Sequence, residues 1–225
     1  MSIPNVRLAG STSTGTNGSS PSPAPNPRGA AAHEAGHLAQ TLAEAFMGDP
    51  IFSWMVPSEP RRQARLRRFF GFELRHLVLP RGTAWTSEQL SGAALVLPPK
   101  AWSTPPRVVM LQGLCFGPRV DRPAGLLAQI ERLHLREPHY YFAYIGVAPT
   151  AQGQGLGSRL MAPTLERCDA EGLPAYLEAS SERNAALYER LGFRLTREVS
   201  FAGSPPLRLM VRPPAPSGSP HRGSY

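Results

Sequence analysis

The chain has 225 residues, a formal net charge of +8 and a hydrophobic fraction of 41%. These values are typical of one folded domain with tails. No apolar run approaches the ~18 residues that a membrane helix needs, and the N-terminus lacks the charged-then-apolar order of a signal peptide. Cys115 and Cys168 have no zinc or redox spacing. We therefore expect a cytoplasmic protein that does not bind membranes.

Both ends of the chain are rich in Gly, Pro and Ser and contain almost nothing that can be buried. We expect residues 1–32 to be a largely disordered segment, in which VRLA offers a first strand at residues 5–9. Residues 213–225 form a second predicted disordered tail. The predicted folded domain is therefore residues 33–212.

The first half of that domain shows helical periodicity. Residues 31–46 place Leu38, Leu42 and Phe46 on one stripe, and residues 59–79 form a second amphipathic helix. Its many arginines lie largely off the apolar stripe and have no aromatic stacking platform, so we expect a solvated face and no nucleic-acid partner. Further elements follow, namely strands at residues 83–86 and 93–97 and a helix at residues 123–135.

The second half alternates strands with helices. The run YYFAYIGV at residues 140–147 has the almost wholly apolar composition of a central strand. A glycine-rich turn and a helix come next, then a strand at residues 175–179, a short helix at residues 184–192 and a final strand pair. This order predicts an α/β fold whose sheet contains at least one parallel pairing.

The segment HEAGH at residues 33–37 matches H-E-x-x-H, in which two histidines hold zinc. On a helix, however, His33 and His37 fall opposite the apolar stripe, on the solvent face. Neither Glu59 nor Glu73, the candidate third ligands, lies in a ligand motif. We therefore do not expect a zinc hydrolase, and we expect no functional metal.

A glycine-rich loop carries the clearest chemical signal. It follows the strand at residues 140–147 and opens a helix, and it consists of Gln152, Gly153, Gln154, Gly155, Leu156 and Gly157. Glycines let the backbone approach an anion, and the free N–H groups of a helix's first turn point at it. A P-loop is excluded because no Lys is present, and the dinucleotide fingerprint because Ser158 follows G-x-G-x-G. The loop suits a phosphate or pyrophosphate, although a turn without a ligand is the alternative.

Two motifs in this half resemble those of a known superfamily. The pattern V-x-P-x-x-Q-x-x-G-x-G from Val147 is similar to the acetyl-CoA-binding motif of the GNAT superfamily of N-acetyltransferases, and LYERLGF at residues 187–193 is similar to the motif that follows it. From Glu137 onward the order of short motifs resembles the actinobacterial group that includes puromycin N-acetyltransferase. The resemblance implies a GNAT-like mixed central β-sheet flanked by helices on both sides. It also implies acetyl transfer from acetyl-CoA to an amine.

The resemblance further implies where acetyl-CoA binds. The backbone of Ile145, Gly146 and Val147 would pair with the pantetheine arm, and the N–H of Val147 would stabilise the oxyanion. The amides of residues 152–158, which end at Ser158, would hold the pyrophosphate. A conserved position of the superfamily is an Asn that contacts CoA; in this chain Ser181 and Asn184 are its two candidates, one helical turn apart.

By the same resemblance, Tyr188 is the general acid that protonates the departing thiolate, and its alternative is a core aromatic residue. Glu178 is the candidate general base, acting directly or through water, and an ion pair with arginine is its alternative. His139 and Glu137 are further candidates. The expected acceptor is a small-molecule amine, for example of an aminonucleoside-type antibiotic or a metabolite. The alternative acceptor is a protein N-terminus or lysine. The alternative function is that of a non-catalytic acetyl-CoA sensor. We expect a monomer or homodimer.

Overall fold

The computed structural model describes residues 26–104, 106–117 and 121–216. Its strands form one seven-stranded sheet in the order β1-β2-β3-β4-β5-β7-β6. The strands are β1 (Arg28–Gly29), β2 (Thr83–Thr86), β3 (Gly92–Leu97), β4 (Tyr140–Val147), β5 (Ala175–Ala179), β6 (Arg194–Val199) and β7 (Leu207–Arg212). Strands β4 and β5 are parallel, and every other neighbouring pair in the sheet is antiparallel. The sheet is therefore mixed, as the sequence predicts.

The helices separate into an early and a late group. The early group is η1 (Ala32–Glu34), α1 (Ala35–Ala45), α2 (Pro50–Met55), α3 (Glu59–Glu73), η2 (Leu74–Val78), α4 (Leu79–Arg81), α5 (Pro106–Cys115) and α6 (Asp121–Leu133). The late group is η3 (Pro149–Ala151), α7 (Leu156–Glu171) and α8 (Glu182–Arg190). Because α3, η2 and α4 follow one another without a break, they correspond to the single helix predicted for residues 59–79.

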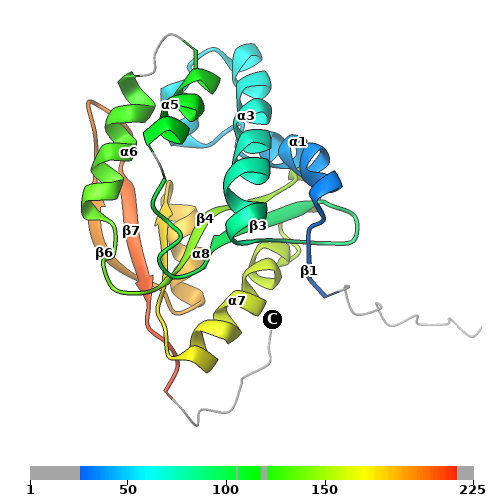
Figure 1. Cartoon of the computed structure of the whole chain (residues 1–225), viewed down its shortest axis with the longest axis vertical. Coiled ribbons are helices and arrows are strands. Elements are labelled where there is room, and N and C mark those ends of the chain that lie inside the picture. Colours follow the sequence, from blue (N-terminus) through cyan, green and yellow to red (C-terminus); the bar gives the residue numbers. More distant parts are fainter. Residues whose placement is uncertain (1–25, 105, 118–120, 217–225) are drawn as a thin grey trace, which may run out of the picture.

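Helices cover both faces of the sheet (Figure 1). Successive residues of β3 enter different cores: Ala93 and Leu95 pack with α1 and α3, whereas Ala94 and Val96 pack with α7. This alternation follows from the two-residue period of a strand, and it explains why the central strands are apolar on both faces. The predicted α/β fold with helices on both sides is confirmed.

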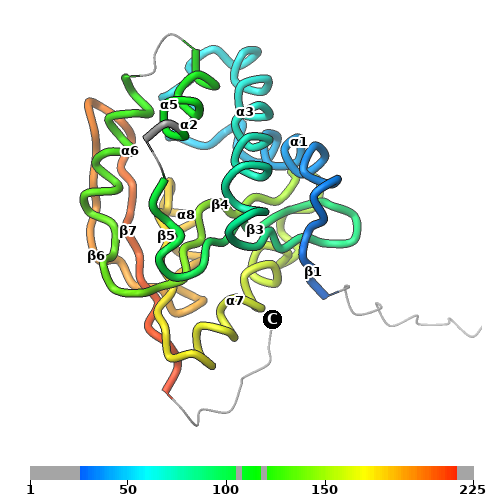
Figure 2. Tube along the Cα trace, viewed as in Figure 1, coloured from blue at the N-terminus to red at the C-terminus, as the bar shows by residue number. Residues whose placement is uncertain are grey.

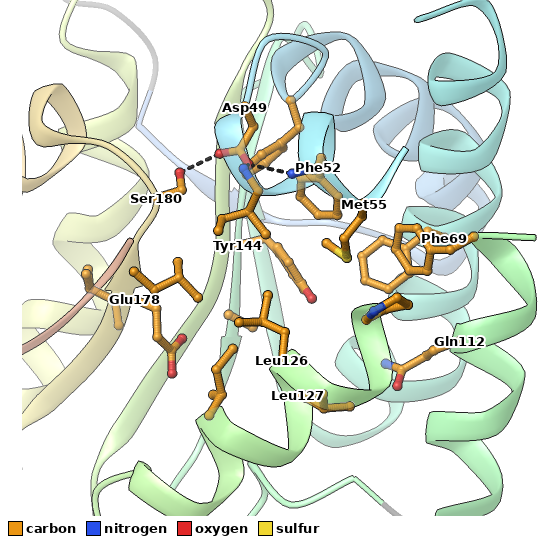
Figure 3. Close-up of a pocket in the computed structure, with 18 of the residues that line it drawn as sticks. Asp49, Phe52, Met55, Phe69, Gln112, Leu126, Leu127, Tyr144, Glu178 and Ser180 are labelled. Carbon is orange, nitrogen blue, oxygen red and sulfur yellow. Dashed lines mark hydrogen bonds between the residues drawn. The ribbon is translucent and has the colours of Figure 1, made fainter. Parts of the chain in front are cut away.

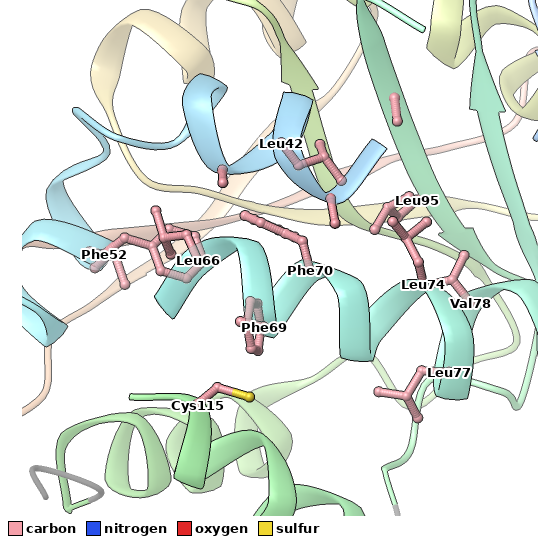
Figure 4. Close-up of a cluster of buried hydrophobic side chains, with 14 of the residues drawn as sticks. Leu42, Phe52, Leu66, Phe69, Phe70, Leu74, Leu77, Val78, Leu95 and Cys115 are labelled. Atoms are coloured by element: carbon pink, nitrogen blue, oxygen red, sulfur yellow. The ribbon is translucent and has the colours of Figure 1, made fainter. Parts of the chain in front are cut away.

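The core on the α1 side is rich in aromatic rings. Phe69 and Phe70 of α3 are buried beneath α1, and Phe52 of α2 contacts both (Figure 4). Their ring centroids lie 5.3 to 5.8 Å apart in tilted or edge-to-face arrangements, which are the favoured ones for aromatic pairs. This core supports one wall of the candidate site described below.

Two helices differ from the sequence prediction. Helix α1 ends just before Gly48-Asp49-Pro50, but no helix was predicted to follow this turn. In the structure Asp49 is the N-cap of α2 and accepts hydrogen bonds from the N–H groups of Ile51 and Phe52, at 2.9 and 3.0 Å. The helix α5 was not predicted. It lies beside α3 and α6 (Figure 2). Two of its large apolar side chains, Met110 and Leu114, are exposed to solvent and are not packed in the core.

The N-terminal margin also contains regular structure. Strand β1 lies within the segment predicted as largely disordered, and Arg28 and Gly29 pair with β2. The strand proposed at residues 5–9 lies outside the described residues. In the described part of the chain, no helix is long and apolar enough to cross a membrane.

Candidate active site

The centre of the sheet opens where β4 and β5 diverge. The two strands pair only from Tyr140 to Phe142 on β4, so the rest of β4 has no strand partner on that side. A register shift in the β3–β4 pairing, between Leu95 and Val96, places Ala143 in a β-bulge at the start of the opening. An extended ligand can therefore pair with the free edge of β4.

Backbone direction along β4 decides which groups face the opening. The N–H of Ala148 donates to the Ser91 carbonyl, on the β3 side. Because N–H groups alternate along a strand, Val147 and Ile145 face the opposite edge, and Gly146 faces β3. The Val147 carbonyl accordingly accepts from the side chain of Gln152 rather than from β3, at 3.0 Å. The predicted donor, the N–H of Val147, faces the open edge.

Gly146 has a packing role that its motif alone does not reveal. A Cβ added there would lie 2.8 Å from Leu42, 3.0 Å from Phe46 and 3.1 Å from Ala45, all on or beside α1. Any side chain at this position would therefore push α1 away from β4. The glycine lets the helix that borders the site approach the strand closely.

The glycine-rich loop connects the end of β4 to α7. Gly153 and Gly155 have φ of +79° and +71°, in the left-handed region that favours glycine, and residues 152–155 are exposed. Gly155 is the N-cap of α7 and has no capping side chain, so the first N–H groups of the helix are available to an anion. Arg159 donates to the Gln154 carbonyl at 2.8 Å and adds a positive charge beside the loop. These residues fit a pyrophosphate.

A pocket of about 470 Å³ lies next to the open edge (Figure 3). Its floor comes from β4 and β5, and its walls come from the C-cap of α1 and from α2, α3, α5, α6 and α8. Most of its lining is apolar, including the rings of Phe46, Phe52, Phe69, Phe116 and Tyr144. Of the predicted site residues, the pocket brings together Ile145, Glu178, Asn184 and Tyr188. The glycine-rich loop, Gly146, Val147 and Ser181 are not part of its lining.

Tyr188 and Asn184 reach the pocket from the same face of α8, one turn apart. Tyr188 is only 6% exposed, and burial together with the nearby Asp49 carboxylate raises the pKa of its phenol, which therefore keeps its proton at neutral pH. Ser181 instead caps α8 and accepts from the N–H of Asn184 at 3.2 Å. Of the two candidates for the CoA-contacting position, Asn184 is the one whose side chain lines the pocket.

Glu178 is a buried carboxyl group on β5. Burial raises the pKa of Glu178 to about 7, and the hydrogen bond that its Oε2 accepts from Tyr141 at 2.8 Å lowers the pKa only in part. The phenol of Tyr176 also lowers the pKa of Glu178. Oε1 has no geometric hydrogen-bond partner among the described residues, and the alternative to a catalytic role, an ion pair with an arginine, is not observed there. A carboxyl group with a pKa near 7 and a free oxygen has the properties of a general base.

Two residues at the site were not found from the sequence. Ser180 donates a hydrogen bond to the Asp49 carboxylate and links the β5–α8 turn to the start of α2 (Figure 3). The two residues are 131 positions apart. The N-cap signature Asp-Pro could have revealed the role of Asp49 on α2, but no local signal indicates its contact with Ser180.

The remaining candidates lie elsewhere. Glu137 is exposed, and His139 is buried behind Glu178 without lining the pocket. His33 and His37 are exposed, as predicted, and Glu34 is hydrogen-bonded to Arg28 at 2.6 and 2.9 Å. In the described part of the chain, no group of three or more His, Cys, Asp or Glu residues is arranged to hold a metal ion.

Comparison with known proteins identifies the family. The model of the acetyltransferase (GNAT) family matches residues 40–193, and the chain belongs to this family. An uncharacterized N-acetyltransferase of Schizosaccharomyces pombe is 37% identical over 83 residues, which are 35% of this chain and 34% of that protein. A mycothiol acetyltransferase of Streptomyces avermitilis is 38% identical over 65 residues, 28% of this chain and 21% of that protein. The chain thus spans about a third or less of these relatives.

Solved structures match over more of the chain. A Corynebacterium glutamicum structure described as histone acetyltransferase HPA2 and related acetyltransferase has a TM-score of 0.66 and 26% identity, and the match covers 87% of this chain and 99% of that one. Drosophila melanogaster polyamine N-acetyltransferase has a TM-score of 0.57 and 17% identity, and the match covers 83% and 98%. At that identity the second likeness shows the fold alone. The GNAT family uses acetyl-CoA, which agrees with the fit of the loop to a pyrophosphate.

Proposed function

We propose that this protein is an N-acetyltransferase that moves an acetyl group from acetyl-CoA to the amine of a small molecule. The observation that carries the proposal is that Glu178 and Tyr188 line one pocket bordered by the open edge of β4. A proton acceptor and a proton donor thus lie on the same cavity. The resemblance to the puromycin N-acetyltransferase group stays a prediction.

Each step has a residue with a suitable property. Acetyl-CoA supplies a thioester carbonyl and a thiolate leaving group. Glu178 removes the proton that the ammonium must lose before its nitrogen can attack. The N–H of Val147, on the free edge of β4, stabilises the negative charge that develops on the carbonyl oxygen. Tyr188 holds the proton that neutralises the departing sulfur.

The cofactor contacts follow from the same geometry. The backbone of Ile145 and Val147 offers hydrogen bonds to the pantetheine arm, while Gly146 allows α1 to pack beside it. The amides of residues 152–158 hold the pyrophosphate. Asn184 contributes a side-chain contact near the thioester end of the cofactor, where it lines the pocket.

The pocket lining favours an acceptor amine with an apolar body and a single cationic group. Both oxygens of Asp49 already accept hydrogen bonds, from the N–H groups of α2 and from Ser180. Of the two acidic side chains in the described lining, only Glu178 has an oxygen without a hydrogen-bond partner. A second ammonium would be buried among apolar side chains, where the one further acidic group of the described lining, Asp49, already accepts three hydrogen bonds, so its burial is costly. A polyamine or an Arg-rich peptide is therefore disfavoured.

The test is thiol release from acetyl-CoA, measured with a thiol reagent over a panel of amines. Arylalkylamines and alkylamines are compared with diamines of matched length, and with lysine and N-terminal peptides. We expect release with the apolar monoamines at least tenfold faster than with the diamines. Tight acetyl-CoA binding without release for any amine would instead identify a sensor. Preferred turnover of peptides would identify a protein acetyltransferase.

A further inference from the structure

A pair of buried histidines lies directly behind Glu178. His134, just after α6, and His139, just before β4, are 3% and 1% exposed. Their Nε2 atoms are 3.0 Å apart. On the outer side, His139 Nδ1 is 2.6 Å from the Glu137 carbonyl oxygen. On the inner side, His134 Nδ1 is 3.7 Å from Oε1 of Glu178.

These contacts determine where the protons lie. A carbonyl oxygen only accepts, so the Nδ1 atom of His139 carries the proton of that ring. In a neutral imidazole the other nitrogen is then an acceptor, so His139 Nε2 accepts from His134 Nε2. The Nδ1 atom of His134 is consequently bare, and it is this atom that faces Glu178.

The surroundings keep both rings neutral. Burial, followed by the charges of His139 and Arg136, lowers the pKa of His134 to about 3, and burial also lowers the pKa of His139. Trp102 stacks on His134 with ring centroids 4.1 Å apart. The other titratable side chains against the pair are Tyr141 and Tyr176, whose phenols are themselves buried and protonated.

The contact between His134 Nδ1 and Glu178 Oε1 has the separation expected when neither atom carries a proton and their lone pairs face each other. The 3.7 Å separation between His134 Nδ1 and Glu178 Oε1 is longer than a hydrogen bond, and Oε1 has no geometric hydrogen-bond partner among the described residues. The nearby phenol of Tyr176 acts in the opposite direction and lowers the pKa of Glu178. An ionised carboxylate gains nothing from a bare nitrogen. A protonated carboxyl group, in contrast, can donate from Oε1 to His134 Nδ1. The pair therefore favours the protonated form of Glu178.

We infer that His134 and His139 are positioning residues that make Glu178 a stronger base. His139 fixes the proton of His134 on Nε2, and the bare Nδ1 of His134 then accepts from Glu178 once Glu178 has taken a proton. In that step an N–H bond of the substrate ammonium breaks, its electron pair stays on the amine nitrogen, and an O–H bond forms on the carboxyl group of Glu178, which then presents this proton to His134 from Oε1. The inference rests on the proposed function for the role of Glu178, but the arrangement of protons does not.

The proton positions can be measured without any activity. In protein with ¹⁵N-labelled histidine, long-range ¹⁵N–¹H spectra distinguish the two neutral tautomers. We expect His134 to be protonated on Nε2 and His139 on Nδ1, with both rings neutral from pH 5 to 8. Detection of Nδ1–H or of an imidazolium at His134 at neutral pH would overturn the inference, whatever the enzyme acetylates.

The effect on Glu178 is tested at His139, which does not touch the pocket. In His139→Leu, His134 is free to carry its proton on Nδ1 and to donate to Glu178. The pKa of Glu178, followed by ¹³C NMR of the labelled carboxyl group, should fall by about one unit. In His139→Gln, the amide oxygen can still accept from His134, and the pKa should stay near the wild-type value. Tyr140→Phe, whose lost hydroxyl contacts Glu171 instead, is the matched control on the same strand.

With an active acceptor in hand, the acid limb of the kcat/KM profile should move down in pH for His139→Leu and not for His139→Gln or Tyr140→Phe. An unchanged carboxyl titration in folded His139→Leu would refute the inference, as would an equal shift in the control. If the tautomers and the Glu178 titration behave as expected but no amine is acetylated, the proposed function fails and the histidine pair stands as a feature of the buried carboxyl group.

Discussion

Tyr188 and Glu178 differ in the protonation state that the site gives them at neutral pH. Burial raises the pKa of both, but the phenol of Tyr188 starts near 10 and so remains fully protonated, while the carboxyl group of Glu178 is brought to about 7. One residue is therefore held as a donor and the other is poised between its two forms. Environment rather than residue type assigns the two roles.

Replacement of Tyr188 by Phe removes the donated proton and keeps the ring. We expect kcat to fall by about 100-fold, the lower part of the range for general acid catalysis, and acetyl-CoA affinity to change less than about twofold. Steady-state kinetics and calorimetry separate the two effects. Tyr140→Phe deletes a phenol that bonds to Glu171 and should leave kcat unchanged. An unaltered kcat in Tyr188→Phe would exclude the residue as the acid.

Replacement of Glu178 by Gln keeps the size of the side chain and removes its titration. Because the pKa of Glu178 is raised to about 7, wild-type kcat/KM should decrease as pH falls through 7. In Glu178→Gln we expect this acid limb to disappear and the plateau to fall by about 100-fold. Profiles measured from pH 5.5 to 9 test this. A variant that keeps the wild-type acid limb would assign the base elsewhere.

Among the secondary-structure elements, those with strong periodicity were predicted well. The apolar runs of β4 and β5 and the glycine-rich start of α7 are local features, and the structure has them at the expected residues. The helix α2 was missed because Gly48-Asp49-Pro50 also occurs as a helix start, and α5 was missed because its exposed apolar residues give no amphipathic pattern. The Asp49–Ser180 and His134–His139 contacts depend on tertiary packing and cannot be predicted from one sequence.

The role of the glycine-rich loop in binding acetyl-CoA can be tested by comparing two glycines that both have a positive φ. Gly153 precedes α7 and Gly172 follows it, and both have positive φ and open space around a built Cβ. Alanine at either position should cost about 1 kcal/mol of stability. Only Gly153→Ala should also weaken acetyl-CoA binding, by about tenfold, because the loop backbone changes. Calorimetry with acetyl-CoA compares them, and equal affinities for the two variants would argue against the loop as the binding site.

Across the whole molecule, buried carboxyl groups link stability to pH. Burial raises the pKa of Glu73 on α3 to about 7, and its side chain accepts a hydrogen bond from Gln112 on α5. The folded state therefore binds more protons than the unfolded state between about pH 4.5 and 7. The contribution of Glu73 to stability is therefore most favourable below pH 4.5 and decreases as pH rises through this window. Glu178 contributes with the same sign.

Glu73→Gln should flatten this dependence. The neutral amide fills the same volume and does not titrate, so the stability difference between pH 4.5 and 7 should shrink by roughly 3 kcal/mol. Thermal melts at half-unit pH steps measure the effect. Glu59→Gln, on an exposed turn of the same helix, should leave the curve unchanged. Parallel curves for Glu73→Gln and wild type would show that Glu73 titrates normally.

The short junction between β4 and β5 has a consequence for mechanics. In the described part of the chain, three residue pairs, from Tyr140 to Phe142 on β4, form the strand pairing between a four-stranded and a three-stranded half of the sheet. We therefore expect the free molecule to flex more easily between β4 and β5 than between the longer pairs β3–β4 and β5–β7. A pantetheine arm lying along Ile145 and Val147 would act as a missing length of strand and stiffen the junction. Amide hydrogen exchange at these two residues should slow when acetyl-CoA is added. The donor substrate would then rigidify the connection between the two halves of the sheet before an acceptor binds.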